Sequence, residues 1–191
     1  MKTFMAKDHT FVVCAYKESP YLRECLDSLF AQTVKTNVIM ATSTPNDYIR
    51  SIAVAYHVPL YFNDGVKSIA DDWNFGIAQA KTELVTIAHQ DDVYLPEYAE
   101  SMIDMMNCFQ RPLIAFSDYG EIRGTEHVYS NPLLKIKKIM LKPLRSKQLM
   151  KSRLVRRRIL SLGSPICCPS VTFVRTNLTV PIFKRGFRSN V

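Results

Sequence analysis

A chain of 191 residues with 47% hydrophobic content can bury one sizeable core, which excludes a disordered or fibrous protein. No apolar run approaches the roughly 18 residues that a membrane-spanning helix needs. The net charge of +8 combines two opposite parts, because residues 1–126 carry −7 and include every carboxylate, whereas residues 127–191 carry +15.

The N-terminal half alternates between strand and helix patterns. Its first eight residues lack the apolar stretch of a secretory signal, so we expect a cytoplasmic protein. A buried apolar strand follows at residues 11–16, and then a helix for which Ser19 is the predicted cap and Pro20 lies in the first turn. Further strands are expected at residues 37–41, 60–62, 84–88 and 113–116, with helices at 48–56, 68–80 and 96–108. This alternation predicts an α/β fold with a mainly parallel sheet and helices on both faces.

The second half is basic and has a different pattern. From about Tyr129 to Leu162, lysines and arginines are interleaved with leucines and isoleucines. We expect this stretch to be helical in two pieces, interrupted by Pro132 and Pro143. Residues 166–174 resemble a late strand, and residues 181–191 receive no assignment.

Polar residues follow the predicted strands where ligands bind in open α/β sheets, at the carboxyl ends of the strands. The sharpest signal is Asp91-Asp92, because adjacent carboxylates on a strand end can hold Mg²⁺ or Mn²⁺ against a diphosphate. Taken alone, such a pair is more often solvated or caps a helix. The five cysteines form no C-x-x-C pair and are expected to be reduced thiols. The glycines form neither G-x-G-x-x-G nor a phosphate-binding loop, which argues against dinucleotide oxidoreductases and nucleoside triphosphatases.

Several segments together resemble glycosyltransferase family 2, which has the GT-A fold. They are FVVCAYKE at residues 11–18, Gln32-Thr33 after the first helix, GVKSIADDWN at residues 65–74 and HQDD at residues 89–92. The chain departs from the family where strand two ends in ATSTP at residues 41–45 instead of Asp-Asp-Gly-Ser. It also has Asp72 where the family often has Arg, and His89 where it often has Asp. These departures leave the identity of the nucleotide open.

The resemblance implies a site for a nucleotide-sugar donor with Mg²⁺ or Mn²⁺. In it, Ala15, Tyr16 and Glu18 border the base and ribose, Asp91 approaches the ribose or the metal, and Asp92 ligates the metal. A hydroxyl of Ser43 or Thr44 can hydrogen-bond a base edge, and Trp73 and Asn74 can supply a stacking face and an amide. Ordinary packing is an alternative role for Tyr16 and Trp73, and capping for Glu18.

By this reading, residues 1–126 form a nucleotide-sugar-binding domain, and residues 127–191 form a basic helical segment with the start of an acceptor part that is cut short. The basic, amphipathic segment suits a solvated face packed on the domain or an anionic membrane surface. Peripheral attachment at the inner membrane would suit an enzyme that adds sugars to lipid-linked acceptors of the cell envelope. Binding to nucleic acid is not expected, because no recognised nucleic-acid motif accompanies the segment.

The function expected from the resemblance is metal-dependent transfer of a sugar from a nucleotide-sugar donor to a saccharide or lipid-linked acceptor, with inversion. Inversion requires a general base. No residue is assigned to that role, because the last carboxylate is Glu126 and the family's base lies in its acceptor half. The alternative is a truncated or degenerate nucleotide-binding module without transferase activity. For the 191 residues alone, slow transfer at most is therefore expected.

Overall fold

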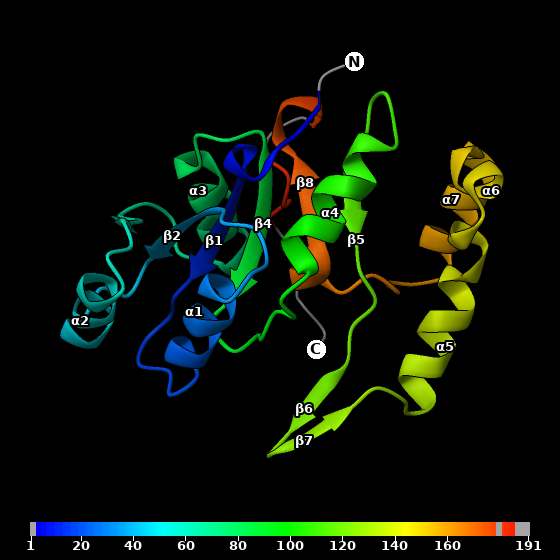
Figure 1. Ribbon diagram of the computed structural model, residues 1–191. Coiled ribbons are helices and arrows are strands. Elements are labelled where there is room, and N and C mark those ends of the chain that lie inside the picture. The colour runs from blue at the N-terminus through cyan, green and yellow to red at the C-terminus, as the bar shows by residue number, and fades with distance from the viewer. Residues whose placement is uncertain (1–2, 179–180, 186–191) are drawn as a thin grey trace. The chain divides into compact units, whose positions relative to one another are not determined.

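The computed structural model describes residues 3–178 and 181–185, which form two compact units (Figure 1). Unit 1 is Met1–Ala115 with Val171–Val191, and unit 2 is Phe116–Ser170. The basic stretch therefore lies in unit 2, and all the predicted strand-end residues lie in unit 1. The predicted division at residue 126 stays a prediction, and the chain's last residues, 186–191, lie outside the described part.

A six-stranded, mostly parallel sheet is the centre of the fold, as predicted. Its strands are β1 (His9–Cys14), β2 (Asn37–Thr42), β3 (Leu60–Phe62), β4 (Leu84–His89), β5 (Ile114–Phe116) and β8 (Val171–Val174). The strand order is β3-β2-β1-β4-β8-β5. β1 pairs in parallel with β2 and β4, β2 pairs in parallel with β3, and β8 runs antiparallel to β4.

Helices cover both faces of this sheet (Figure 1). Side chains alternate along β1, so successive residues pack into core clusters on opposite faces. The helices are α1 (Leu22–Phe30), α2 (Asp47–Ala55), α3 (Ile69–Gln79) and α4 (Tyr98–Asn107), and short 3₁₀ turns lie at Ala6–Asp8, Cys168–Ser170 and Arg175–Asn177. Phe11 and Val13 share one core cluster with residues of α1, α2 and α4. Val12 belongs to the opposite cluster, which includes Ile77 of α3. The sheet is thus buried on both sides.

Two helix starts and two strands differ from their predicted positions. β1 runs from His9 to Cys14 instead of over residues 11–16, so Ala15 and Tyr16 follow the strand. α1 begins at Leu22 with no side-chain cap, and the Ser19 carbonyl instead accepts from the Leu22 amide and, at 2.6 Å, from the Tyr48 hydroxyl. The prediction of Ser19 as the cap was therefore wrong. α4 begins two residues after Pro96. The late strand occupies only the last four residues of the predicted 166–174, because a 3₁₀ turn precedes it.

Unit 2 contains a short hairpin and a chain of small helices. The hairpin is β6 (Glu121–Arg123) with β7 (Glu126–Val128), and the helices are α5 (Pro132–Leu141), α6 (Lys147–Lys151) and α7 (Arg153–Ser161), with a 3₁₀ turn at Lys142–Arg145. The hairpin was not predicted. Helical structure was predicted here, but in two pieces instead of these three helices and a turn. Pro132 sits in the first turn of α5, where its missing amide hydrogen costs nothing. Within the described ranges, no helix has both the length and the apolar character needed to cross a membrane.

Candidate functional site

The parallel register brings the ends of three strands to one edge of the sheet. Cys14, the last residue of β1, is level with Ala41 in β2 and with His89, the last residue of β4. The residues that follow these strands therefore emerge side by side, as the sequence predicted for a ligand crevice.

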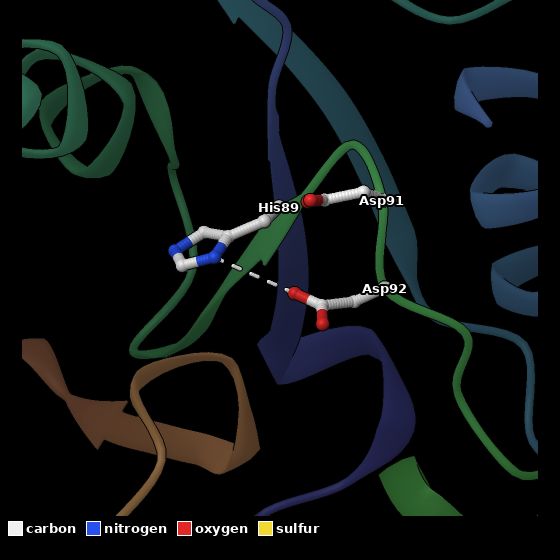
Figure 2. A group of neighbouring side chains, drawn as sticks. All are labelled: His89, Asp91 and Asp92. Atoms are coloured by element: carbon white, nitrogen blue, oxygen red, sulfur yellow. Dashed lines mark ion pairs between the residues drawn. The ribbon is translucent and has the colours of Figure 1, made fainter. Parts of the chain in front are cut away.

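Three side chains at the end of β4 form a cluster that can hold a metal ion. One ligand atom each from His89, Asp91 and Asp92 lies within 4.8 Å of the others. Figure 2 shows the imidazole on the end of the strand and both carboxylates on the turn that follows it. The His89 Nδ1 and an Asp92 oxygen are 3.5 Å apart, while Asp91 is exposed to solvent. The two predicted metal ligands thus lie together, and His89 is a third candidate that sequence reasoning did not assign.

The surroundings of these side chains disfavour the charged forms of Asp92 and His89. Burial, and then the charge of Asp91, raise the pKa of Asp92 to about 7. Burial lowers the pKa of His89, against the opposite effect of Asp91, which favours a neutral imidazole that can act as a ligand. Asp92 Oδ2 and His89 Nε2 are buried atoms without a hydrogen-bond partner in the described chain. Two carboxylates with an unpartnered oxygen are the donor set that Mg²⁺ or Mn²⁺ prefers, so these residues fit such an ion.

Hydrogen bonds fix the strand ends relative to one another. The Tyr16 amide donates to Gln90 Oε1 at 2.9 Å, and Gln90 Nε2 donates to the Tyr16 carbonyl at 3.0 Å, so the turn that carries Asp91 is tied to β1. The Lys17 amide donates to Thr44 Oγ1 at 2.7 Å and ties β1 to the end of β2. Sequence reasoning missed the role of Gln90, because only the pairing of β1 with β4 reveals it.

The predicted residue Ser43 takes part in a partly buried polar network. Its hydroxyl donates to Asp72 Oδ2 at 2.7 Å, and Asn63 Nδ2 donates to the other Asp72 oxygen at 2.7 Å. Asp72 stands where the resembled family often has Arg, and here it anchors the start of α3 to β2. The Ser43 hydroxyl proton is thereby used, but its oxygen can still accept a hydrogen bond.

Trp73 and Asn74 link the cluster to the segment at residues 181–185. The Trp73 ring stacks on His89 with centroids 4.9 Å apart and meets Phe183 edge-on at 4.8 Å. Asn74 Nδ2 donates to the Phe183 carbonyl at 2.7 Å, and its oxygen accepts from the Phe183 amide at 3.0 Å. Trp73 therefore lies beside the cluster, whereas the Asn74 amide is occupied by the Phe183 backbone.

This contact can be tested because Trp73 is the chain's single tryptophan. We expect Asn74→Ala to release Phe183 and shift the fluorescence emission to longer wavelength, because the indole becomes more hydrated. The matched control is Asn107→Ala, which removes the same pair of backbone bonds, there to Phe4. An unchanged spectrum for Asn74→Ala, or an equal shift in both variants, would contradict the contact.

The remaining predicted site residues differ in accessibility. Ala15 is only 3% exposed and its amide donates to the Ala41 carbonyl, so its side chain belongs to the core. Tyr16 is 51% exposed at the strand end, and Glu18 is also exposed. Tyr16 is therefore the aromatic surface that a nucleoside could contact at this edge.

The carboxylates that follow α4 all lie in unit 2. They are Asp118, Glu121 and Glu126. Glu121 accepts hydrogen bonds from Arg123 and Asn131, which hold its pKa below its usual range. A carboxylate stabilised in its charged form is a weak base, so Glu121 does not gain the character of a general base from its surroundings.

Comparison with known proteins gives one family. The model of glycosyl transferase family 2 matches residues 10–179. A glycosyltransferase of Rickettsia typhi is 27% identical over 121 residues, which cover 62% of this chain and 38% of that protein. A second, from Rickettsia prowazekii, is 27% identical over 124 residues with the same shares of each chain. The chain therefore spans much less than half the length of these relatives.

Solved structures share the fold. A glucosyl-3-phosphoglycerate synthase from Mycobacterium tuberculosis, in complex with Mn²⁺, uridine diphosphate and phosphoglyceric acid, matches 89% of this chain and 56% of its own. Its TM-score is 0.60 at 12% sequence identity. A mannosyltransferase from Pyrobaculum calidifontis, in complex with GDP-mannose and Mn²⁺, covers 56% of this chain and 34% of its own, with a TM-score of 0.50 and 18% identity. Together with the family match over most of the sequence, this likeness shows that the chain belongs to glycosyl transferase family 2 and has the GT-A fold.

Proposed function

We propose that the chain transfers a sugar from a nucleotide-sugar donor to a saccharide or lipid-linked acceptor, with inversion, and that Mg²⁺ or Mn²⁺ is required. The observation that carries this proposal is the cluster of His89, Asp91 and Asp92 at the edge where β1, β2 and β4 end, in which the buried Asp92 Oδ2 has no hydrogen-bond partner in the described chain. Membership of the family supports the donor class.

Each part of the edge has a role in this proposal. Asp91 and Asp92 hold the ion, with His89 as a third ligand. An ion held there would supply positive charge to neutralise the leaving diphosphate. The exposed Tyr16 ring borders the nucleoside, and Gln90 holds the Tyr16 backbone against the turn that carries the carboxylates. Preorganisation of this kind lowers the cost of ordering the site when the donor binds.

Three further residues shape the part of the site that recognises the nucleotide. The oxygens of Ser43 and Thr44 lie at the end of β2 and can accept a hydrogen bond from a base edge. The Trp73 indole holds the His89 ring by stacking on it. Because Ser43 and Thr44 stand where the family usually has Asp-Asp-Gly-Ser, uridine and guanosine diphosphates should be compared directly.

Titration calorimetry with a nucleoside diphosphate tests the proposal. We expect uridine or guanosine diphosphate to bind more tightly with Mn²⁺ or Mg²⁺ than with a chelator present. Asp92→Asn should weaken the metal-dependent binding on the order of tenfold or more, because loss even of a residue that supports a metal ligand typically costs about 10- to 100-fold. The change should leave metal-free binding almost unaltered.

The control removes an equal charge elsewhere. Asp104→Asn alters an exposed carboxylate of α4 and should leave nucleotide binding unchanged. If Asp92→Asn binds nucleotide with the same metal dependence as the unmodified protein, the assignment of the metal site is wrong. If neither nucleotide binds under any metal condition, the donor class is wrong.

A further inference from the structure

The helix α5 has a buried face and, on another side, an exposed face that is apolar. Leu134 is 1% exposed. The Lys137 amine donates to the Tyr119 hydroxyl, and the Lys138 amine forms an ion pair with the Asp118 carboxylate. By contrast, Leu133, Ile136 and Ile139 are 55%, 55% and 70% exposed. Their spacing of three residues places them along one side of the helix, so this side has an apolar surface that the hairpin does not cover.

α7 has the same two-sided character, with arginines around its exposed leucines. Ile159 is buried, whereas Leu154 and Leu160 are 76% and 58% exposed. Arg157 and Arg158 lie three and four residues after Leu154, and both are exposed. Arginines and leucines therefore share the outer face of this helix.

The charge of the segment has one sign only. Residues 132–161 contain eleven lysines and arginines and no carboxylate. Nine of the eleven are exposed: Lys135, Lys142, Arg145, Lys147, Lys151, Arg153, Arg156, Arg157 and Arg158. A surface that combines this charge with exposed aliphatic side chains is complementary to one that is anionic at its boundary and apolar just beneath.

We propose that the outer faces of α5 and α7 bind the surface of an anionic lipid bilayer. The leucines and isoleucines enter the boundary between headgroups and acyl chains. The arginines and lysines bury their methylene stems and keep their charged ends among the lipid phosphates. This inference rests on unit 2 alone and does not depend on the proposed transferase activity.

Two other partners fit the same residues less well. Residues 131–162 contain no aromatic side chain and no histidine, so the segment has no platform on which the bases of single-stranded RNA could stack. Its exposed aliphatic residues would gain nothing from a phosphate backbone. A second copy of the chain that paired through this same surface would bring two surfaces of like charge together, which is unfavourable.

Flotation of the whole protein with lipid vesicles tests the proposal. We expect binding to vesicles of phosphatidylcholine mixed with phosphatidylglycerol, and much weaker binding to phosphatidylcholine alone. Salt should weaken the binding, because the Debye length falls from about 10 Å at 0.1 M to about 3 Å at 1 M ionic strength. Equal binding to both kinds of vesicle, or to neither, would overturn the proposal.

Two sets of variants separate the contributions of charge and apolar contact. Arg153→Gln, Arg157→Gln and Arg158→Gln together should weaken binding roughly a hundredfold, because each of the three charges near the surface contributes about fivefold. Leu154→Ser with Leu160→Ser should also weaken it, although the charge is unchanged. All five side chains are exposed, so folding should persist, as circular dichroism can verify.

The matched control is the triple change Lys35→Gln, Lys67→Gln and Lys81→Gln in unit 1, which removes the same charge from exposed positions. It should retain most of the vesicle binding. Equal losses in both triple variants would mean that net charge alone attracts the vesicle, and would overturn the assignment to α5 and α7. An RNA homopolymer that binds more tightly than the anionic vesicles, and that the leucine variant still binds fully, would overturn it in favour of a nucleic-acid surface.

Discussion

Replacing His9 with leucine will make the protein's stability less sensitive to acid. His9 is fully buried at the start of β1, and burial lowers its pKa to about 3. Its Nε2 lies 2.9 Å from Thr86 Oγ1, while Nδ1 is a buried atom without a partner in the described chain. A proton on this ring would therefore place a charge in the core with no counter-charge beside it.

The direction of the effect follows from the two protonation states. In the unfolded chain His9 binds a proton near its ordinary value of 6.5, whereas in the folded protein it does so only near 3. The unfolded state thus binds more protons in this range, so the contribution of His9 to stability is complete above pH 6.5 and is lost as pH falls towards 3. At pH 5 the loss is about 2 kcal/mol, since one pKa unit corresponds to about 1.4 kcal/mol.

Urea unfolding from pH 7.5 down to pH 5 measures this loss. Because other groups also titrate, the relevant quantity is the difference in slope between the unmodified protein and His9→Leu, whatever their stabilities at neutral pH. His127→Gln is the control, because that imidazole is exposed in the hairpin of unit 2. A slope that is identical in the unmodified protein and in His9→Leu would show that His9 is not a buried neutral imidazole.

The parallel part of the fold could be predicted because each element carries its own signal. The apolar run of β1 and the helical spacing of Leu22 and Leu26 in α1 are local patterns, and a strand–helix–strand alternation leaves few arrangements. The return of β8 between β4 and β5 has no such signal. Its pairing joins residues such as Thr86 and Thr172, which are far apart in the sequence, and nothing in either segment specifies the other.

Prediction of the candidate site from the sequence has the same limit, because contacts between distant residues carry no local signal. Residues that follow parallel strands must meet at one edge, so the proximity of Tyr16, Ser43 and Asp91 could be predicted from strand positions alone. Which polar atoms remain available to a ligand could not be predicted, because that depends on hydrogen-bond partners that are distant in the sequence. Asn74 is the example, since its amide is bound by the backbone of Phe183, more than a hundred residues later.

Adding one methyl group at Gly76 will destabilise the protein, although alanine is the better helix former. Gly76 lies in α3 where the helix crosses β1. A Cβ at this position would lie 2.6 Å from Val12 Cγ1 and 3.4 Å from the Ala41 Cβ. Val12 is fully buried and branched at Cβ, so it has little freedom to rotate away.

The competing effects can be compared in magnitude. Helix propensity favours Gly→Ala by about 1 kcal/mol at an exposed helical site, whereas overpacking of a core costs about 1–3 kcal/mol. Overlap at 2.6 Å with a stiff side chain belongs at the upper end of that range, so we expect a net loss of about 1–2 kcal/mol in the free energy of unfolding for Gly76→Ala.

A double-mutant cycle with Val12→Ala identifies the cause. Truncating Val12 removes the atom that the new methyl group would strike, and the methyl group then occupies part of the space left behind. The double variant should therefore lose less stability than the sum of the two single variants, because contacting residues are not additive. Ala78→Gly, at an exposed position of the same helix, should cost about 1 kcal/mol and so confirm that propensity acts normally in α3. Strict additivity of Gly76→Ala and Val12→Ala, or a gain in stability for Gly76→Ala alone, would mean that α3 does not approach β1 as closely as the structure places it.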